Sequence, residues 1–316
     1  MTPPRFALCV PTYNAGEPWH DWLAALHNQT HSPAYTLVID SSSSDDTAKL
    51  ARDAGLDVQT IHKENFNHGG TRQEAVEQLA DYDTLVFLTQ DAILHTPDAL
   101  ARLVNALHAQ LDIGAVYGRQ LPHHGATPIE AHARLFNYPL HSALRSLEDR
   151  SQFGIKTAFF SNSFAAYRRS ALQAIGGFQR DLILGEDTVA ASRMLLADWR
   201  IAYCAEAEVR HSHHYGLRAE MARYFDIGVL HQREHWMLDA FGRAEGEGLR
   251  FIRSEWRYLA RHAPWLIPEA SLRTLLKYAG YRLGRMEQRL PFNWKRRLSM
   301  QPGFWRNNAQ PLSTTD

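Results

Sequence analysis

Apolar residues follow a regular pattern over the first hundred residues of the chain. Short continuous apolar runs alternate with segments in which apolar residues recur at helical spacing. Continuous apolar runs are typical of parallel strands covered on both faces, and alternating strands and helices favour an open, doubly wound α/β sheet. We therefore predict a ligand site beyond the carboxyl ends of the strands. The expected strands are 6–10, 35–39, 58–62 and 84–88, and the expected helices include 47–54 and 71–79.

The pattern changes near residue 217. Beyond it helical spacing dominates, tryptophan is frequent, and 17 Lys and Arg stand against 10 Asp and Glu, whereas the rest of the chain has 17 against 24. We predict an α/β domain over 1–217 and a basic, Trp-rich helical region over 218–316. This region either lies on an anionic membrane surface, which tryptophan and basic residues suit, or completes the core or a dimer interface. Both interpretations stay open.

Composition limits the binding partners and the cellular compartment to be expected for the protein. Net charge is zero, which argues against a general nucleic-acid binder. Cys9 and Cys204 both lie in apolar segments, where free buried thiols are expected, and this favours a reducing compartment. Residues 1–5 lack the apolar core of a secretory signal, and no window reaches the roughly 18–20 apolar residues of a membrane span. We expect a cytoplasmic protein whose membrane contact, if any, is peripheral at the cytoplasmic face of the inner membrane.

Three polar positions follow predicted strands or open a helix. Asp40 ends the second strand, where a carboxylate can accept a hydrogen bond from a nucleotide or simply cap the next helix. Asp91 follows the fourth strand and is either a ligand of a hard divalent cation or a surface turn residue. Gly70 and Arg72 begin a helix, where a backbone N–H and a guanidinium can meet a diphosphate, although a Gly-Gly turn is usually only a turn.

Two further clusters carry titratable groups. Glu186 and Asp187 precede an apolar helix, and since adjacent residues face different ways, one can be a general base while the other braces the loop. The alternative is that acidic residues simply favour a helix N-terminus. His211 and His213 would project to one side of an extended chain and could share a metal, with one contact expected rather than two. Zinc is disfavoured, because no cysteine or HExxH pattern accompanies them.

Six short segments stand in order along the chain: Val10–Asn14, Val38–Asp40, Thr89–Asp91, Gly176–Phe178, Gly185–Asp187 and Val209–His211. Taken together they resemble family 2 glycosyltransferases of the GT-A fold, over residues 5 to about 215. The residues at 40–43, 88–92 and 211–213 are similar to those of bacterial rhamnosyltransferases acting on O-antigen or similar glycans.

The resemblance implies a role for each matching position. It implies that 1–217 is a nucleotide-sugar-binding and catalytic domain and that Asp187 is the catalytic base. It also implies that Asp91 and His211 bind Mg²⁺ or Mn²⁺, with His213 as the alternative histidine ligand. One departure is Thr89, which stands where the family's first metal-motif acid would be. The implied nucleotide-sugar residues are Thr12, Tyr13, Asn14, Asp40, Ser42, Gly70, Arg72 and Gln90, and the expected acceptor-cleft residues are Asn162, Gly177, Phe178 and Glu186, for which ordinary core packing is the alternative.

The implied activity is inverting transfer of a sugar, L-rhamnose from dTDP-L-rhamnose, to a glycan or lipid-linked saccharide acceptor in polysaccharide synthesis. Three alternatives stay open. The first is another nucleotide sugar as the donor, such as UDP-galactose or UDP-N-acetylglucosamine. A sugar nucleotidyltransferase would share the fold, but would normally carry a Gly- and Arg-rich loop where residues 11–15 stand. A non-catalytic glycan-binding module would not need Asp91, Asp187 and His211 together.

Overall fold

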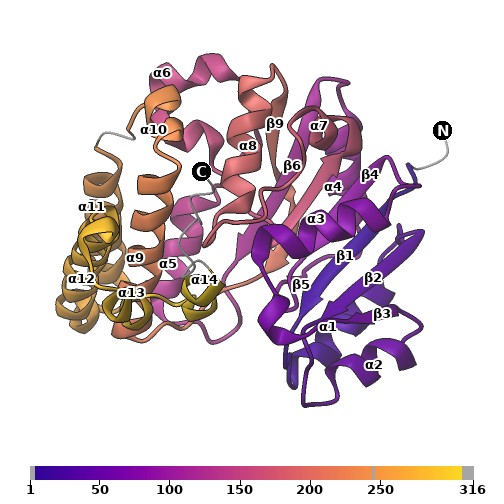
Figure 1. Ribbon diagram of the computed structural model, residues 1–316, viewed down its shortest axis with the longest axis horizontal. Coiled ribbons are helices and arrows are strands. Elements are labelled where there is room, and N and C mark those ends of the chain that lie inside the picture. The colour runs from indigo at the N-terminus through magenta and orange to yellow at the C-terminus, as the bar shows by residue number, and fades with distance from the viewer. Residues whose placement is uncertain (1–3, 244–245, 308–316) are drawn as a thin grey trace, which may run out of the picture.

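A computed structural model describes residues 4–243 and 246–307, and in these ranges all strands belong to one nine-stranded sheet (Figure 1). The order along the sheet is β3-β2-β1-β4-β8-β6-β9-β5, and β7 pairs with β9 outside this path. Residues 1–3, on which the expectation of a missing secretory signal partly rests, lie outside the described ranges. The strands are β1 (Ala7–Thr12), β2 (Tyr35–Asp40), β3 (Asp57–Thr60), β4 (Thr84–Leu88), β5 (Ile93–Leu94), β6 (Ile113–Leu121), β7 (Ala143–Arg145), β8 (Phe164–Arg168) and β9 (Arg200–Arg210).

The first four long strands confirm the predicted parallel α/β half. β3, β2, β1 and β4 are parallel neighbours. β8 then runs antiparallel to both β4 and β6, and β6 and β9 are parallel again. The carboxyl ends of β4, β6 and β9 therefore meet the amino end of β8 at one edge of the sheet, which we call the rim.

Helices cover both faces of this sheet, as the strand pattern predicts. Leu8 of β1 packs with Trp19 on one face, while Cys9, the next residue, packs with Val76 on the other. Cys9 and Cys204 are buried free thiols, as expected. The helices up to β9 are α1 (Pro18–His27), α2 (Thr47–Asp53), α3 (His68–Gln78), α4 (Ala99–His108), α5 (Pro128–Asn137), α6 (Arg150–Phe153), α7 (Arg169–Ala174) and α8 (Glu186–Leu196), with 3₁₀ turns at Lys63–Asn65, Leu147–Asp149 and Gly154–Ala158.

The chain after β9 is helical over its described residues, and these helices lie beside one end of the sheet (Figure 1). α9 and α12 touch through glycines: a Cβ at Gly284 would lie 2.0 Å from the Phe225 carbonyl oxygen. No helix within the described ranges is both long and apolar enough to cross a membrane. The boundary at 217 stays a prediction. The helices are α9 (Leu217–Arg233), α10 (Trp236–Phe241), α11 (Glu247–His262), α12 (Ile267–Arg285), α13 (Phe292–Leu298) and α14 (Pro302–Asn307), with 3₁₀ turns at Pro264–Leu266 and Glu287–Arg289.

Candidate functional site

Hydrogen bonds tie together the loops that follow β1, β2 and β4. Tyr13 N–H donates to Gln90 Oε1 (2.6 Å), and Gln90 Nε2 donates back to the Tyr13 carbonyl (3.0 Å). Ser44 N–H donates to Asn14 Oδ1 (2.8 Å). Asn14 and Ser42 have φ of 45° and 59°, a strained state for non-glycine residues that recurs at functional sites. Because Tyr13, Asn14 and Ser42 are also exposed, this loop cluster can receive a ligand.

Thr12 and Asp40 lie behind these loops instead of facing outward. Thr12 Oγ1 donates to Asp40 Oδ1 (3.0 Å), which also accepts from Ser43 Oγ (2.5 Å), and Ser43 N–H donates to Asp40 Oδ2 (2.9 Å). Thr12 is 2% exposed and Asp40 1%. Both side chains hold the loops from beneath, and the contact of each with a nucleotide stays a prediction.

The groups predicted to meet a diphosphate at the start of α3 have partners within the protein. The N–H groups of Gly69 and Gly70 both donate to Asn67 Oδ1, at 3.0 and 2.8 Å, so the helix N-terminus is capped. Arg72 is buried, and its Nη1 lies 3.0 Å from Glu186 Oε1. The contact of Gly70 and Arg72 with a diphosphate stays a prediction.

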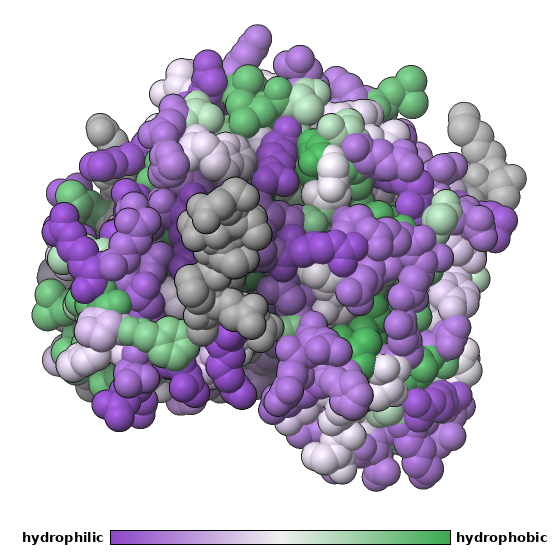
Figure 2. All heavy atoms as spheres, in the orientation of Figure 1, coloured by the Kyte–Doolittle hydropathy of each residue, from purple (hydrophilic) through white to green (hydrophobic). Residues whose placement is uncertain are grey.

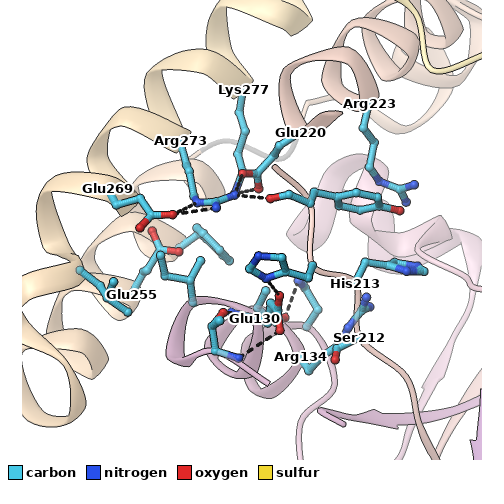
Figure 3. Close-up of a pocket in the computed structure, with 18 of the residues that line it drawn as sticks. Glu130, Arg134, Ser212, His213, Glu220, Arg223, Glu255, Glu269, Arg273 and Lys277 are labelled. Atoms are coloured by element: carbon cyan, nitrogen blue, oxygen red, sulfur yellow. Dashed lines mark hydrogen bonds and ion pairs between the residues drawn. The ribbon is translucent and has the colours of Figure 1, made fainter. Parts of the chain in front are cut away.

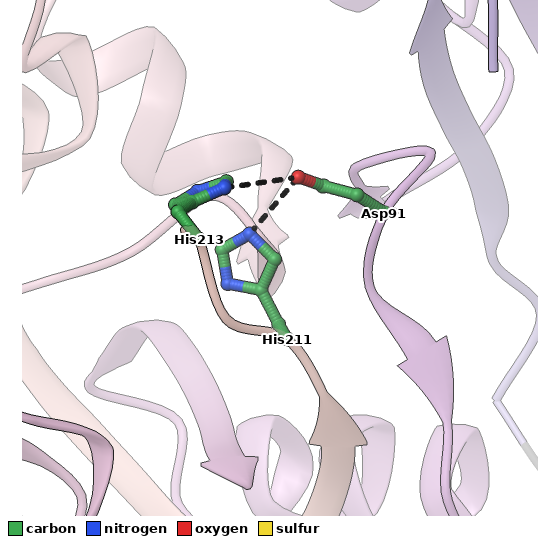
Figure 4. Close-up of side chains that lie close together, drawn as sticks. All are labelled: Asp91, His211 and His213. Carbon is green, nitrogen blue, oxygen red and sulfur yellow. Dashed lines mark ion pairs between the residues drawn. The ribbon is translucent and has the colours of Figure 1, made fainter. Parts of the chain in front are cut away.

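Three predicted metal ligands do come together at the rim (Figure 4). Asp91 lies just beyond β4, and His211 and His213 just beyond β9. His211 Nε2 is 3.3 Å and His213 Nδ1 3.6 Å from Asp91 Oδ2, and one ligand atom from each residue lies within 4.8 Å of the others. Both histidines therefore face the carboxylate, where the sequence favoured one.

A residue that the sequence did not single out holds the first histidine. Gln120, near the end of β6, accepts from His211 Nδ1 (2.8 Å) and from Arg134 Nη1 (2.7 Å) at the same oxygen. Its Nε2 donates to Ser161 Oγ (2.9 Å). Fixing Nδ1–H in this way turns His211 Nε2 toward Asp91, the arrangement by which an outer partner orients a metal-binding histidine. Only its polar character in an apolar strand marks Gln120 in the sequence.

The donor set fits a divalent cation. Burial, and next His211, lower the pKa of His213 to about 3, so its imidazole is neutral and can bind a metal. Burial would raise the pKa of Asp91, but His211 outweighs it and holds that pKa below its ordinary value. Two imidazole nitrogens and one ionised carboxylate would fill three coordination positions of the metal and leave its remaining positions to oxygen ligands.

Asp187 lies in the first turn of α8 and is held by two backbone groups. Its Oδ2 accepts from Asn162 N–H (3.1 Å) and its Oδ1 from Thr188 N–H (2.7 Å). Gly185 enters the helix at φ 79°, and a Cβ there would lie 2.6 Å from Leu230 Cδ2. Burial, and next the charge of Glu186, raise the pKa of Asp187 to about 6, near the value that suits a general base at neutral pH.

Glu186 and Asn162 support Asp187 from behind. Both are buried, and Asn162 Nδ2 donates to Glu186 Oε1 (3.0 Å). Burial would raise the pKa of Glu186, but Arg72 outweighs it, so that pKa lies below its ordinary value. The two adjacent acids thus face different partners, as expected. Glu186 pairs with Arg72, whereas Asp187 accepts hydrogen bonds from the backbone N–H groups of Asn162 and Thr188. The place of the buried Asn162 and Glu186 at the border of an acceptor cleft stays a prediction.

Gly177 and Phe178 also belong to the core. Phe178 is 2% exposed and packs edge-on against Phe87 and Tyr167, with ring centroids 5.4 and 5.2 Å apart. A Cβ at Gly177, whose φ is 80°, would lie 2.1 Å from Gln73 Oε1. Both residues therefore pack in the core, and their place at the border of an acceptor cleft stays a prediction.

Hydrogen bonds connect the candidate metal ligands to the segment that holds the candidate base. Gln120 bonds to His211 with its carbonyl oxygen and to Ser161 with its amide nitrogen. The next residue, Asn162, donates its N–H to Asp187. Asp91, His211 and Asp187, which are far apart in sequence, are thus linked along one edge of the sheet.

Residues 3–225 match the family model described as "Glycosyltransferase like family 2". The chain belongs to this glycosyltransferase family. Within it, two relatives from Salmonella are 48% identical and are covered over 99% of both chains: the O-antigen chain rhamnosyltransferase WbaN of Salmonella anatum and the O-antigen chain rhamnosyltransferase RfbN of Salmonella typhimurium. The resemblance drawn from the six segments is thereby confirmed.

Solved structures confirm the GT-A fold. The mannosyltransferase PcManGT from Pyrobaculum calidifontis, in complex with GDP-Man and Mn²⁺, aligns with a TM-score of 0.56 at 19% identity, covering 97% of this chain and 87% of its own. Residues 1–349 of TarS from S. aureus align with a TM-score of 0.53 at 16% identity, covering 90% and 91%. At such identities the likeness concerns the fold alone.

Proposed function

We propose that the protein transfers L-rhamnose from dTDP-L-rhamnose to a glycan or lipid-linked saccharide acceptor in O-antigen synthesis, with inversion at the anomeric carbon. The observation on which this rests is the hydrogen-bonded rim: Ser161 contacts the residue that holds His211 of the three-residue metal-binding group, and the next residue, Asn162, holds Asp187, a carboxylate with a raised pKa. The donor sugar and the process are supported by the two relatives, which are named O-antigen chain rhamnosyltransferases.

In this reaction Asp187 accepts the proton of the acceptor hydroxyl as that oxygen attacks the anomeric carbon. The bond from that carbon to the diphosphate oxygen breaks, dTDP leaves, and no sugar–enzyme bond forms. The hydrogen bonds from Asn162 and Thr188 fix the carboxylate, and its pKa of about 6 leaves it ionised at neutral pH. A metal bound by Asp91, His211 and His213 supplies charge neutralisation to the departing diphosphate.

The metal is Mn²⁺ or Mg²⁺, and we place Mn²⁺ first. Mg²⁺ prefers an all-oxygen environment, whereas two of the three donors here are imidazole nitrogens. The mannosyltransferase with this fold was solved with Mn²⁺. Tyr13, Asn14, Ser42 and Gln90 border the same edge and are the residues we assign to the nucleotide.

The C-terminal helices bring the enzyme to the cytoplasmic face of the inner membrane. Of the fifteen exposed large hydrophobic side chains among the described residues, ten lie between 249 and 300. Trp265 is 73% exposed, and Leu272, Leu275 and Tyr278 recur every third residue on one side of α12. Residues 246–307 hold 13 Lys and Arg against 4 Glu, which suits anionic lipid. Apolar side chains lie among polar ones at the left edge of the face in Figure 2, where Figure 1 has α11, α12 and α13.

A donor screen tests the activity. Wild-type protein is incubated with dTDP-L-rhamnose, UDP-galactose or UDP-N-acetylglucosamine, each without metal and with Mg²⁺, Mn²⁺ or Zn²⁺, and release of nucleoside diphosphate is measured. We expect slow hydrolysis of dTDP-L-rhamnose and of neither UDP-sugar. The hydrolysis should be fastest with Mn²⁺. Hydrolysis of a UDP-sugar in preference would refute the donor assignment, and hydrolysis of none would refute the enzyme assignment.

Vesicle co-sedimentation tests the membrane contact. We expect binding to vesicles with anionic lipid and little binding to neutral ones, with a clear loss of binding for Trp265→Ala plus Leu275→Ala. Leu111→Ala is the matched control, since Leu111 is 86% exposed but lies between α4 and β6. Equal sedimentation of all three proteins would contradict the proposal.

A further inference from the structure

A cavity of about 280 Å³ adjoins the rim site on the side of the C-terminal helices (Figure 3). Its walls come from α5, α9, α11, α12 and the segment 212–215 that follows β9. His213 belongs to both this wall and the metal-binding group. The volume is just under the roughly 300–1,000 Å³ of small-molecule sites, so the cavity can hold one ring-sized group.

The charges around the cavity cancel. Glu220 accepts from both Arg273 and Lys277 at 2.8 Å, and Arg273 also pairs with Glu269 at 2.7 Å. His214 Nδ1 lies 2.5 Å from Glu130 Oε1, which is also in the cavity wall. Lys and Arg equal Glu in number among the lining residues. A lining without excess charge favours a neutral polar ligand over a phosphate or a free cation.

Aromatic rings provide the apolar part of the wall. Tyr215, Tyr224 and Phe251 all line the cavity, and Arg223 lies 5.8 Å from the centre of the Tyr215 ring. Small-molecule sites combine such aromatic surface with a few placed polar groups. A sugar ring offers matching surfaces, with C–H groups on its faces and hydroxyl groups around its edge.

Glu255 is the polar group that the protein itself leaves unsatisfied. It lies on α11 in the cavity wall and is 1% exposed, and its Oε2 has no hydrogen-bond partner among the described residues. Burial raises the pKa of Glu255 to about 7. A buried carboxyl group without a partner is destabilising, and a hydroxyl group entering the cavity would provide one.

We infer that this cavity binds a neutral sugar residue of the acceptor, with Glu255 hydrogen-bonded to one of its hydroxyl groups. The inference rests on the proposed glycosyl transfer and adds to it the location of the acceptor. Because the cavity shares His213 with the metal-binding group, a sugar held there lies beside the point of transfer. The helices after β9 then select the acceptor, while the sheet holds the donor.

A cavity-filling variant tests this directly. Methyl glycosides of galactose, mannose and rhamnose serve as probes, and their dissociation constants are measured by saturation-transfer NMR. Ala133 lines the cavity from α5, so Ala133→Phe should weaken binding of the preferred glycoside at least tenfold. Leu135→Phe is the matched control, because Leu135 lies on the same helix but is 45% exposed and outside the cavity lining; it should bind as wild type.

Glu255→Met separates ligand binding from a structural role. Removing a buried unpaired carboxyl should leave the melting temperature equal to or above that of wild type, while glycoside binding falls at least fivefold. Wild-type binding in Ala133→Phe, or failure of every glycoside to bind wild type, would overturn the inference. Donor hydrolysis by wild type, which needs no acceptor, is measured in parallel: its absence would refute the proposed function, whatever the glycosides do.

Discussion

The nucleotide side and the metal side of the rim are held together by different kinds of contact. On the nucleotide side, hydrogen bonds join neighbouring exposed loops, as between Tyr13 and Gln90, and the partners of the buried Asp40 are neutral groups. On the metal side, buried charged groups are held by residues distant in sequence, as Arg72 holds Glu186. The first side can adjust to a ligand, whereas the second is fixed before the ligand arrives.

This difference predicts where substitutions should have large effects. A buried ion pair that loses one partner leaves an uncompensated charge, while a neutral loop hydrogen bond contributes only about 1 kcal/mol. The metal side should therefore be the more sensitive half, in both stability and catalysis. The following predictions run from the largest expected effect to the smallest.

Asp187→Asn should lower the rate of transfer by roughly 10²–10⁴, the usual range for loss of a general base. The affinity for dTDP-L-rhamnose should stay within about twofold of wild type, because Asp187 acts on the acceptor. Transfer rates and donor titration calorimetry measure the two quantities. Near-normal turnover would exclude Asp187 as the base.

Arg72→Met should destabilise the fold by roughly 3–5 kcal/mol, because Glu186 would remain buried without its partner. Arg180→Met is the matched control: its pairs with Glu74 and Glu77 are about half exposed, so the loss should stay below roughly 1 kcal/mol. Urea unfolding compares the two. Equal losses of unfolding free energy in the two variants would mean that the buried ion pair stabilises the fold no more than an exposed one.

Gln120→Leu should weaken Mn²⁺ binding by roughly 10–100-fold, the usual effect of removing the outer partner of a metal-binding histidine. Titration followed by electron paramagnetic resonance measures this without any turnover. Gln173→Leu, at an exposed position on α7, should bind Mn²⁺ as wild type does. An unchanged affinity of Gln120→Leu for Mn²⁺ would show that Gln120 does not support the metal site.

The pH profile of kcat/KM should fall roughly tenfold per unit below an inflection near 6, because a base must be ionised to accept a proton. Glu186→Gln should move that inflection to lower pH, since the charge of Glu186 helps to raise the pKa of Asp187. An inflection that stays in place would show that another group controls the acidic limb.

Thr12→Val should cost roughly 1.5–3 kcal/mol, because it removes one hydrogen bond to the buried acidic side chain of Asp40 and keeps the shape of the side chain. Asp40 would retain its two bonds from Ser43. Urea unfolding measures the change. A loss as large as that of Arg72→Met would erase the proposed contrast between the two sides.

The sequence predicted the parallel half of the fold because its strands are continuous apolar runs. It did not predict β8, since nothing in residues 164–168 indicates that this strand runs antiparallel between β4 and β6. Among candidate site residues, it pointed to Asp91, His211 and His213, which lie together in the structure, and to Asp187, whose role as base stays a prediction; all four stand in motifs at strand or helix ends.

What the sequence could not show is which way a side chain faces. Arg72 and Asp40 are as polar as Asp91, but a buried partner holds each of them inward. Phe178 follows two glycines as a cleft residue might, but it packs edge-on in the core. Gln120 acts through its contact with His211, and such contacts between distant segments leave no local pattern.

The central claim is that the metal-binding group, Asp187 and the donor diphosphate belong to one site. Paramagnetic broadening of the ³¹P signals of dTDP by protein-bound Mn²⁺ tests it most directly. The account predicts that both signals broaden with wild type and with Asp187→Asn, and that His211→Ala abolishes the broadening. Broadening that persists in His211→Ala would put the metal elsewhere and contradict the account.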